Sequence, residues 1–197
     1  MLLSQIQGFA KGTILNNELM SKHTSYGIGG KVLAYIRPFD RYELIKIIKL
    51  INNTNSDYYF IGSGSNLLVN DKNINAYIIT PAKSLKSLNI NKNVIIADSG
   101  VMLGKIVKET IKHNLTGLES LVGVPGTLGG ALMMNAGAWG AEISNYLVSL
   151  EVISSNGEIK TLYPNDIEFN YRNSSLNPDE FILSAKFKLN KASKEDI

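Results

Sequence analysis

The sequence predicts an α+β protein built from two consecutive units, and three observations indicate this. Short apolar runs typical of strands recur along the chain, two segments carry apolar residues at helical spacing, and turn-forming Gly, Asn and Asp residues separate them. With 197 residues, of which 44% are hydrophobic and 19% charged, the chain can bury a sizeable core as one large domain or two small ones. We expect a first unit at residues 1–82 and a second at residues 83–190.

The first unit is predicted to contain one helix and four strands. The helix spans residues 40–53, where Asp40 can cap the start and Leu44, Ile47 and Ile51 fall at helical spacing. Apolar runs bounded by turn residues predict strands at residues 32–37, 58–61, 67–69 and 76–80.

The second unit is predicted to contain one long helix, at residues 101–114, and a set of strands. The predicted strands are residues 94–97, 147–154, 157–162 and 181–189. Asn156-Gly157 is a typical turn for a hairpin between the second and third of these strands. Ser193 with Asp196 resembles a capping box, so we expect residues 191–197 to begin a helix that leads toward a further domain.

The composition excludes several classes of function. The chain has no cysteine, which removes disulfides, thiolate metal sites and cysteine nucleophiles, and its two histidines, His23 and His113, are far apart in sequence. We therefore predict no metal site. The net charge of +3 comes without a cluster of basic residues, which disfavours nucleic acid as a partner. The N-terminus lacks the pattern of a secretory signal, so we expect a cytoplasmic protein.

One uncharged stretch, residues 121–141, is long enough to span a bilayer. It contains six glycines together with Pro125 and Asn135, and acidic residues flank it where a membrane helix would have Lys or Arg. We therefore expect a buried glycine-rich loop and a short helix, and no membrane as a partner.

A glycine-rich loop, Gly62-Ser63-Gly64-Ser65-Asn66, directly follows the predicted strand at residues 58–61. Its glycines allow positive φ and leave the backbone uncovered, so peptide N–H groups and the serine and asparagine side chains can bind an anion such as a pyrophosphate. The loop lacks the lysine of a Walker A motif and the third glycine of a Rossmann fingerprint. From this motif alone, anion binding and an ordinary tight turn remain equal alternatives.

A second glycine-rich segment spans residues 117–140, with seven of the 17 glycines and one charged residue, Glu119. Residues 126–130 could form another anion-binding turn, and the small residues after it would let the backbone approach a flat, mostly uncharged group such as a flavin ring. The alternative is a tightly packed crossing of the core. Two such loops together favour a large phosphate-bearing cofactor, while the missing Rossmann pattern disfavours a nicotinamide-binding Rossmann domain.

Arg172, in the segment FNYRNSSL, is the only arginine after residue 41 in a chain that otherwise uses lysine. Its guanidinium can bind a carboxylate or phosphate through two parallel hydrogen bonds, which lysine cannot do. A structural salt bridge is the alternative. His23 and His113 are interpreted as structural, since His113 falls near a helix end where it can contact the last carbonyls.

Four segments in this order resemble the UDP-N-acetylenolpyruvoylglucosamine reductase family, also called UDP-N-acetylmuramate dehydrogenases: HTSYGIGG from His23, then GSGSN, then GLESLVGVPGTLGGALMMNAGAWG, then YRNS. The long third block followed by YRNS is highly specific, and the four segments extend over nearly the whole chain. The resemblance implies the FAD-binding fold shared with vanillyl-alcohol oxidase and p-cresol methylhydroxylase, in which two α+β subdomains hold FAD between them.

The resemblance also implies an activity. Members of the family are flavoproteins of peptidoglycan precursor synthesis, and so of cell-wall biogenesis, cell shape and cell division. They hold FAD without a covalent bond, take electrons from NADPH and reduce UDP-N-acetylglucosamine enolpyruvate to UDP-N-acetylmuramate.

The same resemblance assigns residues to roles. It makes Arg172 the catalytic arginine beside the substrate carboxylate, with Tyr171 and Arg172 as substrate contacts. The residues implied to contact FAD are those of the two loops, namely Gly62, Ser63, Gly64, Ser65, Asn66 and Leu67 in the first, and Gly123, Val124, Pro125, Gly126, Thr127, Gly129, Gly130, Ala131, Asn135, Gly137, Ala138 and Gly140 in the second.

The sequence departs from the family pattern after residue 190. The family has a third domain there, which binds the UDP-sugar and supplies a serine proton donor in a Gly-Ser-x-Phe-Lys motif and a late glutamate, and this sequence has neither. We therefore expect a chain that binds FAD but has little or no reductase activity alone. The alternative is a flavin-binding or interaction module of the same fold without catalytic activity of its own.

Overall fold

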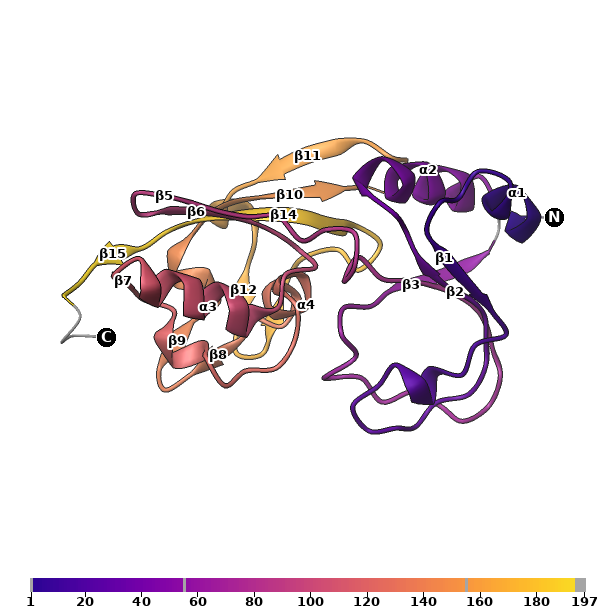
Figure 1. Ribbon diagram of the computed structural model, residues 1–197, viewed down its shortest axis with the longest axis horizontal. Helices are drawn as coiled ribbons and strands as arrows, with labels where there is room; N and C mark the ends of the chain where they lie inside the picture. The colour runs from indigo at the N-terminus through magenta and orange to yellow at the C-terminus, as the bar shows by residue number, and fades with distance from the viewer. Residues whose placement is uncertain (1, 55, 155, 194–197) are drawn as a thin grey trace.

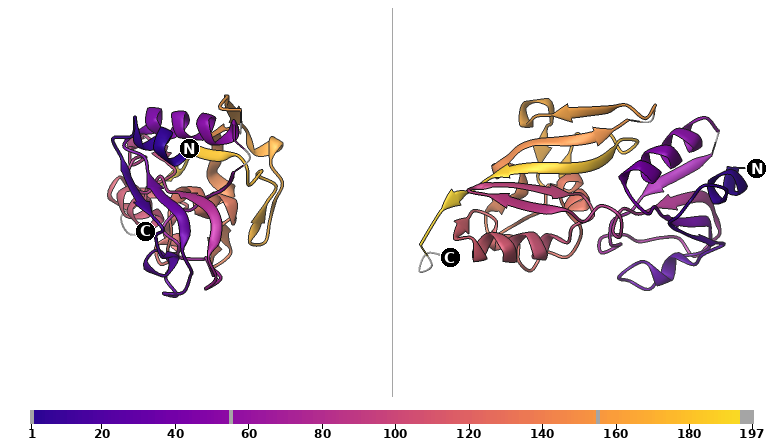
Figure 2. Two further views of the ribbon diagram at one scale, coloured as in Figure 1. Left: turned by 90° about the vertical axis from the view of Figure 1, so that its right-hand side faces the viewer. Right: turned by 45° about the horizontal axis from the view of Figure 1, so that its top comes forward.

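The computed structural model describes residues 2–54, 56–154 and 156–193. These residues form two units that lie side by side along the long axis of the molecule (Figure 1). Each unit is built on its own sheet, and the second view in Figure 2 shows the smaller sheet with its helices on one side and the larger sheet on the other.

The first unit is a four-stranded sheet covered on one face by helices. Strands β2, β4 and β3 are parallel, and β1 pairs antiparallel with β2 at the edge, in the order β1-β2-β4-β3. Its elements are α1 (Leu2–Gln7), β1 (Thr13–Asn16), the 3₁₀ turn η1 (Met20–Lys22), β2 (Val32–Arg37), α2 (Arg41–Asn52), β3 (Asp57–Phe60) and β4 (Ile74–Ile79).

Helix α2 confirms the prediction made from its spacing and its cap. The Asp40 carboxylate accepts a hydrogen bond from the Glu43 backbone N–H at 2.8 Å, which satisfies one of the unpaired donors at the helix start. Leu44, Ile47 and Ile51 are fully buried and pack on the sheet. The helix therefore covers the face of the parallel strands, as a crossover between β2 and β3 must.

The second unit is a five-stranded antiparallel sheet in the order β11-β10-β14-β6-β5, and α3 and α4 lie on one of its faces (Figure 1). The elements are β5 (Leu88–Asn91), β6 (Val94–Asp98), α3 (Leu103–Lys112), β7 (Leu115–Thr116), η2 (Glu119–Leu121), α4 (Leu128–Met133), β8 (Gly137–Ala138), β9 (Ala141–Glu142), η3 (Ile143–Tyr146), β10 (Leu147–Ile153), β11 (Ile159–Leu162), η4 (Pro164–Asp166), β12 (Phe169–Asn170), β13 (Asn173–Ser174), β14 (Phe181–Lys188) and β15 (Asn190–Lys191).

The two units share part of their apolar core. Ile153, Phe181 and Leu183, from strands β10 and β14 of the second sheet, pack into the cluster under α2. Beside them, Arg41 of α2 donates to the Glu151 carboxylate at 3.1 Å. The units are therefore joined by packing as well as by the chain, and the predicted boundary at residue 82 stays a prediction.

The structure differs from the predicted secondary structure at residues 67–69 and at elements that the sequence did not indicate. The strand predicted at residues 67–69 is wrong: this segment is irregular because it pairs with no strand of the described sheets, although Leu68 is 72% exposed and Val69 packs in the cluster beside η1. The sequence interpretation also missed α1, β1 and β5. The helix expected from Ser193 falls on residues 194–197, which lie outside the described part of the chain.

The uncharged stretch at residues 121–141 folds as loops around the short helix α4, as expected. Within the described ranges, no helix is long and apolar enough to cross a membrane.

Candidate functional site

The two glycine-rich loops meet where the two units face each other. Gly62 follows β3, and Thr127 is the residue before α4; a Cβ on Gly62 would overlap the Thr127 hydroxyl oxygen. Nearby, the Ser65 hydroxyl donates to the Pro125 carbonyl at 3.3 Å. Loops that lie 60 positions apart in the sequence therefore form one surface, which is the arrangement that a single large ligand would need.

The second loop is held in place by the end of strand β6. The backbone N–H of Gly129 donates to the Ser99 carbonyl at 2.9 Å, and that of Leu128 donates to the Val101 carbonyl at 2.8 Å. On the other side, the Leu103 N–H donates to the Gly126 carbonyl at 2.9 Å. These bonds fix the first turn of α4 against the sheet and occupy the N–H groups of Leu128 and Gly129, while Gly130 stays exposed.

A cavity of about 350 Å³ lies at this junction and is lined mainly by aromatic and small residues. Its walls include Tyr58, Phe60, Pro81 and Phe181, and its floor includes Gly62, Ser99, Thr127, Gly129 and Gly130. The Ser99 hydroxyl is buried and has no hydrogen-bond partner in the described structure. A buried hydroxyl without a partner is unfavourable, so a polar group of a ligand in this cavity would stabilise it.

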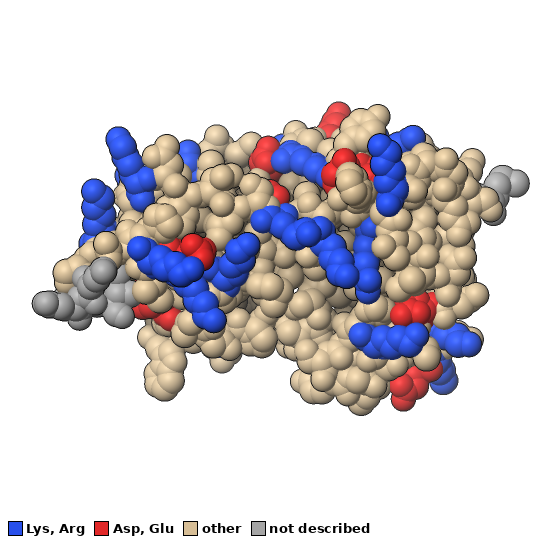
Figure 3. All heavy atoms as spheres, viewed as in Figure 1, with Lys and Arg blue, Asp and Glu red and all other residues tan. Residues whose placement is uncertain are grey.

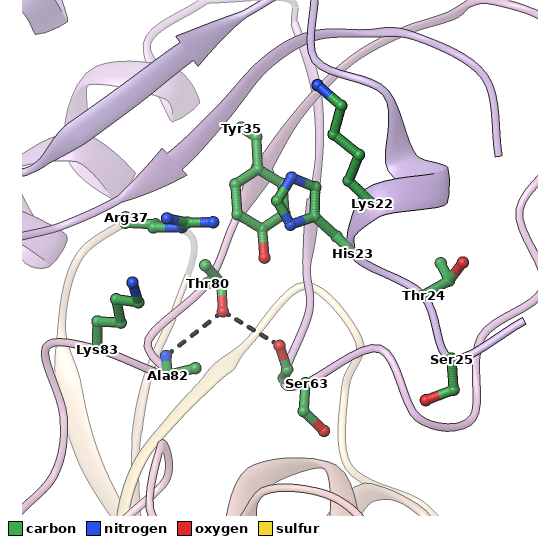
Figure 4. A pocket seen from close by; sticks show the side chains of 11 residues that line it. Lys22, His23, Thr24, Ser25, Tyr35, Arg37, Ser63, Thr80, Ala82 and Lys83 are labelled. Atoms are coloured by element: carbon green, nitrogen blue, oxygen red, sulfur yellow. Dashed lines mark hydrogen bonds between the residues drawn. The ribbon is translucent and has the colours of Figure 1, made fainter. Parts of the chain in front are cut away.

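A second, more polar cavity of about 280 Å³ opens on the other side of the first loop and shares Gly62 with the aromatic one. The side chains that line it include Lys22, Arg37, Ser63 and Lys83 (Figure 4). Figure 3 shows a run of cationic side chains across the middle of the face where the two units adjoin. The first loop therefore lies between an apolar cavity and a positively charged one.

Arg172 is at the tip of the hairpin formed by β12 and β13. Its backbone has φ of 54°, a left-handed conformation that costs about 1–2 kcal/mol for a side chain of this kind. The guanidinium carbon lies 5.0 Å from the centre of the Tyr171 ring, and within the described ranges no carboxylate approaches it to 4 Å. The structural salt bridge considered as the alternative is thus not formed with any described residue, and the fork remains open to a ligand.

The Arg172 hairpin is fastened to the second glycine-rich segment by two side chains. Ser174 of β13 donates its hydroxyl to the Met133 carbonyl at 2.8 Å. The fully buried Asn135 donates its amide to the Glu142 carboxylate at 2.7 Å and to the Asn170 carbonyl at 3.1 Å. A Cβ on Gly137 would lie 3.2 Å from Arg172 Nη1, so the absence of a side chain there lets the guanidinium rest on this segment.

Glu119 and His113, which the sequence analysis names, make hydrogen bonds within the second unit. Burial opposes ionisation of Glu119, but hydrogen bonds from the Thr116 hydroxyl at 2.6 Å and the Gly117 N–H outweigh this effect and lower its pKa. His113 caps the end of α3 and lies with Nδ1 2.8 Å from the Glu109 carbonyl. Neither faces the two cavities.

The predicted site residues occupy three places. The first group, lining a cavity, consists of Gly62, Ser63, Thr127, Gly129 and Gly130. The second group lies in the two loops or in the helix that follows the second loop: Gly64, Ser65, Asn66, Leu67, Gly123, Val124, Pro125 and Gly126 are in the loops, and Ala131 is in α4. The third group lies in the Arg172 hairpin or in the part of the second glycine-rich segment that contacts it, and consists of Asn135, Gly137, Ala138, Gly140, Tyr171 and Arg172. The ligand contacts assigned to them stay predictions.

Sequence reasoning missed Ser99 and the aromatic walls. Ser99 lies two residues after the strand predicted at residues 94–97 and precedes a glycine, a local pattern similar to the start of the first loop, and this pattern could have indicated it. Tyr58, Phe60 and Phe181 were assigned only to strands. Nothing in their spacing separates a side chain that lines a cavity from one in the core.

The residues present fit FAD. Gly62 and the exposed Ser63 of the first glycine loop line the cavities, where their peptide groups can face a diphosphate; the aromatic cavity can take a flat ring, and the Ser99 hydroxyl lacks a partner in the described structure. Arg37 and Lys83 add positive charge beside the first loop.

Comparison with known proteins agrees with this assignment. Residues 32–163 match the FAD binding domain family. The chain is 39% identical over 191 residues to UDP-N-acetylenolpyruvoylglucosamine reductase of Streptococcus mutans, covering 96% of this chain and 62% of that protein. It is 40% identical over 182 residues to the protein of the same name from Clostridium kluyveri, covering 92% of this chain and 60% of that one. The chain thus spans about three fifths of the length of these relatives.

Solved structures give the same fold. The crystal structure of UDP-N-acetylenolpyruvylglucosamine reductase from Thermus caldophilus matches with a TM-score of 0.78 at 28% identity, over 95% of this chain and 65% of that one. An alkyldihydroxyacetonephosphate synthase matches with a TM-score of 0.70 at 15% identity, over 96% of this chain and 40% of that one, which shows the fold alone. The predicted fold class, the two-subdomain FAD-binding fold of the vanillyl-alcohol oxidase type, is confirmed. With the family match extending over most of its length, the chain belongs to the FAD binding domain family.

Proposed function

We propose that this chain is the FAD-binding part of an NADPH-dependent reductase that converts UDP-N-acetylglucosamine enolpyruvate to UDP-N-acetylmuramate in peptidoglycan precursor synthesis. The observation that carries the proposal is Arg172, a guanidinium with no carboxylate partner in the described structure, held in a strained turn against the second glycine-rich segment. The relatives from Streptococcus mutans and Clostridium kluyveri, whose name gives this activity, support it.

The cofactor would be held at the junction of the two units. The backbone at Gly62, Ser63 and the exposed Gly130 would bind its diphosphate, and the aromatic cavity with Ser99 would take a ring system. When bound, FAD supplies the ability to accept a hydride from NADPH and to pass it on to a second substrate.

Arg172 would act on the substrate carboxylate. Addition of a hydride to the enolpyruvyl double bond leaves negative charge on the carbon next to that carboxylate, and the charge spreads onto the carboxylate oxygens. Two N–H donors of a guanidinium placed at those oxygens stabilise the developing charge more than they stabilise the ground state. The fixed hairpin supports this role, because a donor that needs no reorganisation is the more effective one. We assign the proton that completes the reduction to no residue of this chain.

The test uses the purified chain with the C-terminal part of the Streptococcus mutans relative supplied as a separate protein or as a fusion. We expect the chain alone to bind FAD and show a flavin absorption spectrum, with little or no NADPH oxidation that depends on the substrate. Addition of the C-terminal part should restore this oxidation. FAD binding without turnover in the fusion would favour the alternative, a flavin-binding module, and a chain that shows no flavin spectrum after addition of FAD would contradict both.

A further inference from the structure

Asn135 is a fully buried polar residue in the segment that supports the Arg172 hairpin. Its amide nitrogen carries two hydrogens, and both are donated within the chain, to the Glu142 carboxylate at 2.7 Å and to the Asn170 carbonyl at 3.1 Å. Its oxygen Oδ1 is buried and has no hydrogen-bond partner in the described structure. The cost of that unpaired oxygen offsets part of what the two bonds contribute, so fold stability gives this side chain only a limited advantage.

The bond to Asn170 acts on the backbone beside Arg172. Asn170 pairs with Asn173 across the hairpin, so these two residues flank the tip, Tyr171-Arg172. The Asn135 amide therefore fixes the strand that leads into Arg172, whose φ of 54° is a left-handed conformation that persists only where the surroundings hold it.

The bond to Glu142 acts on a carboxylate that is within reach of Arg172. A Cβ on Gly137 would lie 3.1 Å from Glu142 Cγ and 3.2 Å from Arg172 Nη1, so both side chains border the same small space, which glycine leaves open. The two nevertheless form no ion pair, because within the described ranges no carboxylate comes within 4 Å of the guanidinium. Glu142 Oε2 accepts from the Asn135 amide instead.

We propose that Asn135 is a positioning residue that keeps the Arg172 guanidinium free for a ligand carboxylate, by fixing Asn170 and by holding Glu142 away. Without the amide, Glu142 can turn toward Arg172 and occupy its two parallel donors, since opposite charges this close attract each other outside bulk water. A carboxylate of the chain then competes with the carboxylate of the substrate. The effect on catalysis rests on the proposed function, whereas the arrangement of the three side chains does not.

The resemblance to the reductase family implies a different role for Asn135, as a contact of FAD. Both hydrogens of its amide are donated within the chain and the side chain is fully buried, so only Oδ1 is left for a ligand. The two roles differ in what removal of the side chain does. It weakens FAD binding in one case and gives an ion-paired Arg172 in the other.

The first test follows Arg172 by NMR in the chain made with isotope-labelled arginine. Arg41, which donates to both Glu151 oxygens, is the internal reference for a guanidinium whose rotation a carboxylate restricts. Asn135→Gly removes the amide and suits the φ of 40° at this position. We expect rotation of the Arg172 guanidinium to slow by at least about threefold in this variant, because it gains a charge-assisted pair.

Reversal of this change identifies Glu142 as its cause. In Asn135→Gly/Glu142→Gln the side chain at residue 142 is uncharged, and Arg172 should return to its wild-type rotation. The matched control, Thr110→Val, removes another buried hydrogen bond of the second unit, from the Thr110 hydroxyl to the Val107 carbonyl at 2.8 Å, and should leave Arg172 unchanged.

Asn135→Asp serves if Asn135→Gly does not fold, since it keeps the size of the side chain and repels Glu142 by its like charge. The proposal is overturned if Arg172 rotates equally in the wild type and in the folded Asn135 variant. It is also overturned if Glu142→Gln does not reverse the change.

The second test measures turnover in the fusion with the C-terminal part of the Streptococcus mutans relative. Asn135→Gly should lower kcat/KM for the substrate by at least about tenfold, with FAD affinity within about twofold of the wild type. In an Arg172→Ala background the same change should add less than about twofold, because Asn135 acts through the guanidinium. Weaker FAD binding with unchanged turnover at saturating FAD would support the cofactor role and overturn the proposal. A wild-type fusion without turnover would contradict the proposed function and not this arrangement, which the NMR measurement decides.

Discussion

Gly62 and Thr127 approach so closely that a single methyl group on Gly62 would overlap the Thr127 hydroxyl. This contact joins the first unit to the second at the point where the two predicted cofactor loops face each other. Glycine is required at residue 62 because of this approach and not because of its backbone angles, since its φ is not in the left-handed region.

Substitution Gly62→Ala should weaken FAD binding by at least about tenfold, because the added Cβ pushes the two loops apart. The measurement is quenching of flavin fluorescence on titration. Thr127→Ala removes the overlapping oxygen, and the remaining Thr127 carbon atoms would lie 3.4 Å or more from the new Cβ. The double variant should therefore bind FAD more tightly than Gly62→Ala alone, and failure of this rescue would show that the effect does not come from the loop contact.

The hydrogen bonds that hold the Arg172 hairpin against the second glycine-rich segment should contribute to the free energy of unfolding. Ser174→Ala removes the hydrogen bond to the Met133 carbonyl and should lower the free energy of unfolding by about 1 kcal/mol. Asn135→Ala removes the amide that is shared by Glu142 and Asn170 and should lower it by about 1–3 kcal/mol, since a part-buried carboxylate loses its partner.

Ser120→Ala is the matched control for urea unfolding of these variants. The Ser120 hydroxyl is buried without a hydrogen-bond partner in the described structure, so its removal should leave the free energy of unfolding unchanged or slightly higher. If Ser120→Ala and Ser174→Ala destabilise the chain equally, the bond to Met133 contributes nothing specific.

Much of the fold could be predicted from local pattern. Helix α2 followed from one cap and the spacing of its isoleucines, and strands β2, β4, β6, β10 and β14 followed from their apolar runs, because burial of these residues dominates the local energetics. The segment at residues 67–69 has the same kind of run but forms no strand. It pairs with no strand of the described sheets, and such pairing depends on the tertiary arrangement, which the local sequence does not encode.

The candidate site could be predicted only in part. Glycine content located both loops, but their contact through Gly62 and Thr127 depends on how two sheets pack, which no local spacing encodes. The cationic cavity was missed for a related reason. Lys22, Arg37 and Lys83 are scattered along the chain; the parallel pairing of β2 with β4 brings Arg37 close to the segment that holds Lys83, and η1 adds Lys22.

The ion pair between Arg41 and Glu151 should make stability depend on pH. Hydrogen bonds from Arg41 and then Ser184 hold the pKa of the Glu151 carboxyl below its ordinary value of 4.5, although desolvation opposes them. A carboxyl whose pKa is lower in the folded state stabilises the protein above its unfolded pKa, and this contribution is lost as the pH falls through the folded value. Both side chains are 39% exposed, so solvent screening limits the contribution to about 0.2–1 kcal/mol.

The corresponding measurement compares the wild type with Glu151→Gln by urea unfolding from pH 7 down to pH 3. The wild type should be more stable at pH 7, and the difference should disappear as the pH falls below 4.5. Arg41→Gln should remove most of the same difference, because Arg41 is the main cause of the shift and the hydrogen bond from Ser184 remains. A gap between wild type and Glu151→Gln that is constant over this range would mean that the glutamine changes packing and not charge.

Arg172→Lys separates the charge of the side chain from its shape. Lysine keeps the positive charge but loses the two parallel donors, so it should still attract the substrate carboxylate and stabilise the transition state less well. In the fusion with the C-terminal part of the Streptococcus mutans relative, we expect kcat for substrate reduction to fall by about 10–100-fold while FAD affinity is unchanged. Arg41→Lys is the control, because lysine can keep the ion pair with Glu151, and it should stay within about twofold of the wild type. If Arg172→Lys turns over as fast as the wild type, the guanidinium serves to order the hairpin and has no part in the transition state.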